Sequence, residues 1–285
     1  MKHKSNKNSS KRTKEMFENI VDKLQTIVNS GEYERFLKFN KNFRGYSFNN
    51  LVLIYSQFPN ATKVAGKSKW LKMKRQLVSG AKKIFIIAPL PRKFNKTIKI
   101  IEDGEELEKK ETIEYNSYRY VYVYDVSQTE GEPLPLQSNN INCNDMAYFY
   151  EKLKSFSDYP VLEEELYGGT KGYYSPSKEH IVIKNTLSAN DKAAVLLHEL
   201  SHAMYDDFDY STDRNLSEVF VESIAYIVAD YFGLDTSLCS FNYIIKWAKG
   251  DPKVVLELGS KIQKCANEFI DKIENYELQE IKLVA

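Results

Sequence analysis

Apolar residues recur at helical spacing in a segment that follows Ser188. The repeating positions are Ala193, Leu196, Leu197, Leu200, Ala203 and Met204. This is the period of an amphipathic helix, and Ser188 with Asp191 three residues later forms a capping-box start. A second helical segment runs from about Leu216 to Phe232, and Gly233 is a typical C-terminal cap. The pattern predicts two consecutive helices, each with one apolar face.

The first 130 residues combine a polar tail, helices and strands. Residues 1–14 are rich in Lys, Ser and Asn and predict a disordered basic tail. Helices are expected from Glu15 to near Gly31 and from Ser47 to Gln57. β-Branched and aromatic residues predict strands at 84–90, 96–101 and 118–129. We interpret the acidic stretch 102–111 as a solvated hairpin loop or insertion.

Residues 131–145, with two prolines and a polar cluster, predict a linker. A helix is expected to begin at about Met146. Residues 172–184 predict a hairpin that turns at Ser175, Pro176 and Ser177. A last helix is expected to follow Pro252. The chain is therefore expected to be α+β with two domains. An N-terminal domain of mixed helix and antiparallel sheet covers 15–130, and a domain containing the helix after Ser188 covers 146–285.

Charge divides the chain along its length. Residues 1–100 hold 23 Lys/Arg and 5 Asp/Glu, a net of +18, whereas residues 101–285 hold 17 and 34, a net of −17. A half this basic favours a polyanionic partner, and the acidic half would repel one. An ordinary solvated basic surface is the alternative.

Aromatic residues, cations and amides alternate around residues 39–50. Single-stranded nucleic acid is bound by aromatic faces that stack on bases, cations that neutralise phosphates and amides that read base edges. Residues 61–83 follow with eight Lys/Arg and no acid. Trp70 within them is equally well a base platform or a core anchor. The candidate DNA-binding residues are Arg44, Tyr46, Phe48, Asn49, Asn50, Lys67, Trp70, Lys74, Arg75 and Lys82.

The motif with the most explicit chemistry is His198-Glu-Leu-Ser-His202. Residues four apart lie on one face of a helix, so His198 and His202 can bind one zinc ion together. Glu199 would then lie beside the open coordination position, where it could move a proton between water and a leaving amine. The alternative is a histidine pair that binds no metal.

A catalytic zinc normally keeps three protein ligands and one water. On the second helix Glu218 and Glu222 share a face with Ala225 and Ala229, and two carboxylates on an otherwise apolar helix need partners. Either one can supply the third ligand. Tyr173, Tyr205 and Tyr210 are candidate donors to a tetrahedral oxyanion. The strand with Ile181 and Ile183 is expected to offer its edge to an extended peptide.

HELSH followed by EVFVES resembles the gluzincin arrangement of ImmA/IrrE-like metallopeptidases, which have a zincin-like fold. The resemblance implies that Glu218 is the third zinc ligand and that Glu222 orients a histidine. Residues 46–90 and 120–129 resemble the N-terminal single-stranded-DNA-binding domain of ArdC-like antirestriction proteins, in which such a domain precedes a zincin domain. The implied function is protection of transferred mobile-element DNA after conjugation, with Zn²⁺ or another divalent transition metal as cofactor and a protein or peptide as substrate.

Two alternatives remain open. One is a non-proteolytic protein that coats single-stranded DNA and has a structural or vestigial zinc site. The other is an ImmA-like regulatory protease that cleaves a repressor. Three scattered cysteines, Cys143, Cys239 and Cys265, indicate a reducing compartment, and no apolar run approaches the ~20 residues of a membrane span. A cytoplasmic protein that does not bind membranes is expected.

Overall fold

A computed structural model describes residues 2–102, 105–134, 145–205, 207, 210–234 and 252–284. The chain forms two compact units. The hairpin unit contains residues 1–23 and 52–132, and the helical unit contains residues 24–51 and 133–285. The second junction lies next to the predicted linker. Residues 24–51, however, group with the C-terminal part of the chain and not with the N-terminal domain expected to hold them.

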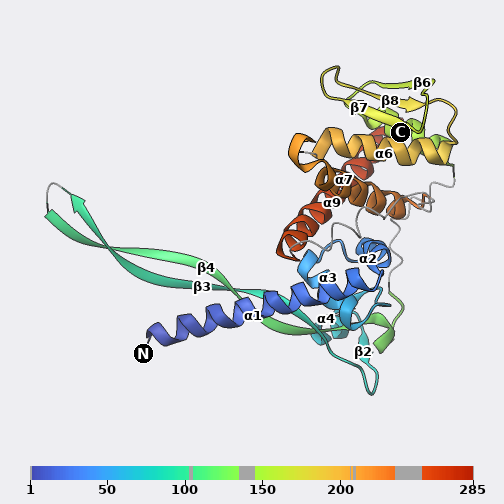
Figure 1. The fold of residues 1–285 in the computed structure, drawn as a ribbon. Helices are drawn as coiled ribbons and strands as arrows, with labels where there is room; N and C mark the ends of the chain where they lie inside the picture. The colour runs from blue at the N-terminus through green and yellow to red at the C-terminus, as the bar shows by residue number, and fades with distance from the viewer. Residues whose placement is uncertain are drawn as a thin grey trace. The chain divides into compact units, whose positions relative to one another are not determined.

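The hairpin unit is a small mixed α/β assembly around a sheet of order β1-β4-β3 (Figure 1). A separate pair of strands joins β2 to β5. Helices α1 and α3 each contribute part of their length to this unit. Its elements are α1 (Lys2–Asn29), α3 (Phe48–Gln57), β1 (Val64–Ala65), α4 (Lys67–Lys72), β2 (Arg75–Leu77), β3 (Ile84–Glu102), β4 (Glu105–Asp125), η2 (Val126–Gln128) and β5 (Thr129–Gly131).

Strands β3 and β4 form one long antiparallel hairpin, paired from Ile84↔Val123 to Glu102↔Glu105. The acidic stretch predicted as a loop is therefore mostly strand, and the two strands predicted at 84–90 and 96–101 are one.

Helix α1 begins at Lys2, where a disordered tail is expected. Residues 2–29 contain no Gly or Pro, so nothing in the sequence stops the helix that begins in the apolar segment. Gly31, with φ +76°, follows its end as predicted.

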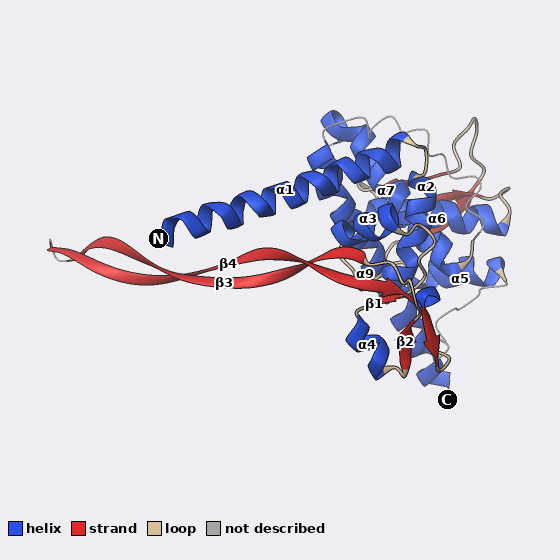
Figure 2. Cartoon of the chain, turned by 90° about the horizontal axis from the view of Figure 1, so that it is seen from below, coloured by secondary structure: helices blue, strands red, loops and turns tan. Residues whose placement is uncertain are grey.

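The helical unit packs α6, α7 and α9 together, with a three-stranded sheet against α6 (Figures 1 and 2). In this sheet β8 is central, parallel to β6 and antiparallel to β7. Besides parts of α1 and α3, the elements are α2 (Tyr33–Asn40), η1 (Lys41–Phe43), α5 (Met146–Phe156), β6 (Val161–Glu164), β7 (Gly172–Ser175), β8 (His180–Lys184), α6 (Ala189–Tyr205), α7 (Tyr210–Phe232) and α9 (Pro252–Val284).

Both predicted metal-site helices are present. Ser188 Oγ accepts from the N–H of Asp191 (3.1 Å) and donates to its carboxylate (2.7 Å), which forms the predicted capping interaction at the start of α6. Helix α7 ends before Gly233 as expected but starts at Tyr210, six residues earlier than predicted. The segment 205–215 lacks Gly and Pro, so the helix extends into the predicted loop.

Residues 24–51 are attached to α7 and α9 by ion pairs and packing. Lys41 Nζ lies 2.9 Å from the Asp230 carboxylate, and Arg44 pairs with Asp271 and with Glu274 on α9. A methyl group built on Gly259 would overlap the buried ring of Phe48. This segment is therefore an integral part of the helical unit.

No helix in the described ranges is long and apolar enough to cross a membrane. Cys265 is a buried free thiol on α9, whereas Cys143, Cys239 and the amphipathic segment expected at 241–247 lie outside the described residues.

Candidate metal centre

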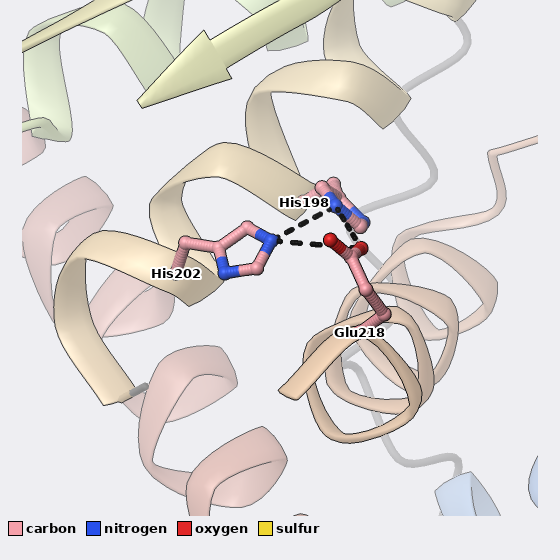
Figure 3. A group of neighbouring side chains, drawn as sticks. All are labelled: His198, His202 and Glu218. Carbon is pink, nitrogen blue, oxygen red and sulfur yellow. Dashed lines mark hydrogen bonds and ion pairs between the residues drawn. The ribbon is translucent and has the colours of Figure 1, made fainter. Parts of the chain in front are cut away.

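The structure brings His198, His202 and Glu218 together, with one possible ligand atom from each lying within 4.8 Å of the others (Figure 3). Helix α6 supplies both histidines from adjacent turns, and α7 supplies the carboxylate. Four residues of the apolar stripe of α6 are buried, namely Ala193, Leu196, Leu197 and Leu200, whereas Ala203 and Met204 are half-buried. The histidines lie off that stripe on the side facing α7.

The distances fit a single tetrahedral ion. Nε2 of His198 lies 3.2 Å from Nε2 of His202, and Oε2 of Glu218 lies 3.6 Å and 3.9 Å from these two nitrogens. Ligand atoms bound at about 2.0–2.1 Å in a tetrahedron are roughly 3.4 Å apart. Two imidazoles and a carboxylate therefore converge at a spacing that suits a divalent metal.

Glu222 contacts His198 on the side of the ring that faces away from the other two ligands. Its Oε2 lies 2.9 Å from Nδ1 of His198, on the far side of the ring from the nitrogen that faces His202 and Glu218. A carboxylate at this nitrogen orients a ligating imidazole and increases its basicity. Glu218 is thus at the convergence point and Glu222 behind the histidine, the arrangement that the resemblance implies.

Glu199 is 8% exposed and is held by the backbone of β7. The N–H of Tyr174 donates to its Oε2 at 2.9 Å. This close approach requires Gly172, since a Cβ there would lie 2.6 Å from Val195 of α6 and 2.9 Å from the Val182 carbonyl oxygen. Residue 172 must therefore be a glycine for β7 to lie against α6.

Burial raises the pKa of Glu199, against the opposing effects of His198 and the Tyr174 N–H. For His198, burial lowers the pKa, but hydrogen bonds to Glu218 and Glu222 outweigh it and raise it to about 10. The hydrogen bond from His198 lowers the pKa of Glu218, and the nearby Arg214 adds to this effect.

Two cavities adjoin the site. One of about 290 Å³ extends from His198 and Glu199 toward Val195, Ala225 and Ala229, with Lys171, Asn190 and Asp191 also in its wall. The other, of about 760 Å³, has Tyr173 and Tyr174 on one side and Arg214 and Glu218 on the other. The metal group therefore opens to space on both flanks, as a site that must admit a substrate requires.

Sequence reasoning missed Tyr174 and Arg214. Arg214 precedes Glu218 by one helical turn, a spacing that could have revealed it had the helix been extended upstream. Of the candidate oxyanion donors, Tyr173 lines the larger cavity. Tyr205 packs on Phe269 of α9, and the side chain of Tyr210 lies outside the described set.

The strand expected to offer its edge to a peptide is the wrong one. Strand β8, with Ile181 and Ile183, is hydrogen-bonded on both sides. Strand β7 is the edge next to Glu199. The alternation of hydrophobic residues identified both strands but carried no information on their order.

Of the ten candidate DNA-binding residues, five belong to each unit. Phe48 is 2% exposed and Asn50 is buried, so their side chains are not available for stacking or base reading. The Arg44 guanidinium is engaged by Asp271 and Glu274. Tyr46, half-buried, accepts a bond from Gln263 at its carbonyl, and Asn49 is also half-buried. This cluster is packing for the helical unit.

Two roles were open for Trp70 in the hairpin unit, a base platform or a core anchor, and the structure shows the core anchor. Its ring is fully buried and its Nε1–H donates to the Tyr124 carbonyl at 3.0 Å. The Arg75 guanidinium binds Thr129 and the backbone of β5. Lys67, Lys74 and Lys82 are exposed and remain available to a polyanion.

Residues 10–126 match the family model described as the N-terminal domain of anti-restriction factor ArdC. An uncharacterized protein of Bacillus anthracis, pXO2-81, is 24% identical over 92% of this chain, and the chain spans about half (51%) of its length.

Two solved structures of the antirestriction protein ArdC from the R388 plasmid share the fold. The metal-free structure has a TM-score of 0.56 and 16% identity, covering 90% of this chain and 97% of that one. The Mn(II)-bound structure has a TM-score of 0.58 and 14% identity, covering 91% and 97%. The chain therefore resembles ArdC: residues 10–126 match the ArdC N-terminal domain, and nine-tenths of the chain shares the fold of ArdC.

Proposed function

We propose that this chain is an antirestriction-type protein that binds single-stranded DNA and carries a zinc-dependent metallopeptidase site in a zincin-like domain. The observation that carries the enzymatic part is the convergence of His198, His202 and Glu218 at the spacing of a tetrahedral metal ion. The Mn(II)-bound structure of ArdC from R388 supports a divalent metal in this fold. Two histidines and a carboxylate match the ligand set of catalytic zinc.

A bound divalent ion would supply Lewis acidity, lowering the pKa of a water and polarising a carbonyl. The residues of the chain do the rest. Glu222 holds the ring of His198, so that its Nε2 faces the other two ligands. Glu199 accepts a proton from the attacking water and donates it to the leaving amine, and burial favours both functions by raising its pKa toward neutrality.

An extended peptide can lie along the outer edge of β7. The Lys184 N–H bonds to the Lys171 carbonyl, and antiparallel pairs alternate, so Gly172 and Tyr174 direct their backbone groups away from β8. The bond from Tyr174 N–H to Glu199 agrees with this orientation. The backbone N–H and C=O of Gly172 and the carbonyl of Tyr174 face the side on which the two cavities open. These groups can pair with the backbone of a substrate strand.

The N-terminal part supplies DNA binding in this proposal. Residues 61–101 hold twelve Lys/Arg and no Asp/Glu, and the region matches the ArdC N-terminal domain. Phosphate neutralisation by such a surface gives affinity that falls steeply with salt. We place this activity in the cytoplasm, where transferred DNA meets restriction enzymes.

Metal analysis of protein purified without chelators tests the metal site. We expect about one equivalent of zinc. His202→Ala should lose it, and His180→Ala is the matched control because His180, on β8, is not part of the metal group. Wild-type protein without metal, or metal retained by His202→Ala, would exclude the proposed site.

Proteolysis is tested with a peptide library read by mass spectrometry. Glu199→Gln should keep the metal and DNA affinity and abolish cleavage. Antirestriction that survives in Glu199→Gln would favour the alternative in which the protein coats the strand. Cleavage of one defined protein, with weak DNA affinity, would favour the regulatory protease.

A further inference from the structure

Two aromatic rings are exposed side by side on the β3–β4 hairpin. Phe85 is 41% exposed and Tyr122 is 48% exposed. They are direct partners across the ladder, with ring centroids 5.0 Å apart. Tyr120 contacts Phe85 from the next position, at 6.3 Å. The rings form a continuous aromatic strip on one face of the hairpin.

Most of the buried residues beside the strip lie on the opposite face of the hairpin, although Ile87, on the same face as Phe85, is also buried. Ile84, Ile86 and Val123 point to the opposite face and are buried. Further along the aromatic face, Phe17 of α1 covers Tyr118 with a ring contact of 5.4 Å. The strip is thus closed at one end by the helix and open at Phe85 and Tyr122, where folding leaves the rings in contact with solvent.

The edge of β3 beside the strip is blocked against another strand. The Gln57 side chain donates to the Phe85 carbonyl (2.8 Å) and accepts from the Phe85 N–H (2.9 Å). Both outward backbone groups of Phe85 are therefore occupied. A partner strand therefore cannot pair with the backbone of Phe85, whereas the ring of Phe85 is open to a ligand.

The charge near the strip is positive. Lys83 Nζ lies 4.9 Å from the centroid of the Tyr122 ring, a cation–π distance. It belongs to the stretch 61–101 with twelve cations and no acid. Planar apolar faces beside cations match a ligand in which flat rings alternate with negative charges.

We propose that Phe85, Tyr122 and Lys83 form a base-stacking platform, on which unpaired nucleobases stack while the lysine contacts the phosphate backbone. This rests on the proposed DNA binding and identifies the residues that carry it, in place of Trp70 and Phe48. Every base has a stackable face, so the platform tolerates any sequence. Bases inside a duplex have no free face, so the platform selects single strands.

Fluorescence anisotropy with a labelled oligothymidine of about 20 nucleotides tests the platform. Phe85→Leu and Tyr122→Leu remove a ring but keep an apolar side chain suited to the exposed face of a strand. Each should weaken binding by about 10-fold, since stacking on one base is worth about 1–3 kcal/mol. Tyr122→Phe keeps the ring and should bind like wild type. Tyr167→Leu is the matched control, because Tyr167 is 80% exposed in the helical unit.

Three results separate the possibilities. Leucine variants that retain wild-type melting and affinity overturn the platform while leaving DNA binding intact. Wild-type protein that fails to bind the oligonucleotide overturns the proposed DNA binding itself. A duplex of the same length should bind the wild type and the leucine variants equally, and an equal loss on duplex and single strand would overturn base stacking. Lys83→Gln should lower the slope of log affinity against log salt by about 1.

Discussion

The packing of Phe48 against Gly259 gives a test of how residues 24–51 belong to the fold. Gly259 lies within α9, and a Cβ there would overlap three atoms of the Phe48 ring. The ring is 2% exposed and also contacts Phe36, at 5.6 Å between centroids, so it has little room to move. Gly259→Ala therefore forces overpacking in the core of the helical unit.

Two opposing effects set the magnitude. Overpacking costs about 1–3 kcal/mol. Alanine favours a helix over glycine by about 1 kcal/mol. We expect Gly259→Ala to lower the free energy of unfolding by about 1–2 kcal/mol. In a Phe48→Leu background the overlapping ring atoms are gone, so the same substitution should raise the stability by up to about 1 kcal/mol.

Urea unfolding followed by circular dichroism, for wild type, both single variants and the double variant, measures this sign reversal as a coupling energy. All four proteins need the same metal content, because a bound ion stabilises the folded state. A stabilising effect of Gly259→Ala of equal size in both backgrounds would refute the contact. The attachment of residues 24–51 to α9 would then rest on the Arg44 ion pairs alone.

Three further predictions concern single side chains. Glu222→Gln should weaken metal affinity by about 10- to 100-fold in competition with a chromogenic chelator, and unchanged affinity would exclude its orienting role. Trp70→Phe should cost about 0.5–1.5 kcal/mol of stability by removing the hydrogen bond from Nε1–H to the Tyr124 carbonyl, with the DNA affinity of the folded protein unchanged. Unchanged stability with lost DNA affinity would make the indole a base platform. The hydrogen bond from Lys192 lowers the pKa of Glu163 in the folded protein. The ionised Glu163 carboxylate therefore stabilises the fold at any pH above its pKa in the unfolded chain. This stabilisation is lost as the pH falls through the lower pKa of the folded state. Glu163→Gln should therefore be less stable by roughly 0.5–1 kcal/mol at pH 7, and the difference should disappear once the pH falls below the lowered pKa of Glu163. A pH-independent difference in unfolding midpoint would contradict this.

The metal group could be predicted because two of its three ligands lie close together in the sequence. His198 and His202 are one turn apart on one helix, and that spacing defines their shared face whatever else the chain does. The sequence also reduced the third ligand to Glu218 or Glu222. The choice between them depends on how α7 is rotated about its axis relative to α6. That rotation is set by tertiary packing and cannot be derived from the sequence of α7 alone.

The aromatic and cationic residues 39–50 show where a pattern fails. Alternating rings and cations suit a nucleic-acid surface and a core with a charged rim equally well. What separates the two is the partner of each cation, and Arg44 finds Asp271 and Glu274 more than 220 positions away. No periodicity within the segment records that pairing. The same limit applies to β7 and β8, whose order in the sheet depends on β6.

The distance along the chain between residues 24–51 and their partner helices also matters during synthesis. The ribosome releases Phe36, Phe43 and Phe48 long before α7 and α9 exist to cover them, because residues 52–132 of the hairpin unit are translated in between. Contacts of such high sequence separation form slowly, and the waiting apolar segment is open to aggregation. A nascent chain of this protein should therefore depend on a chaperone until nearly its last helix has emerged.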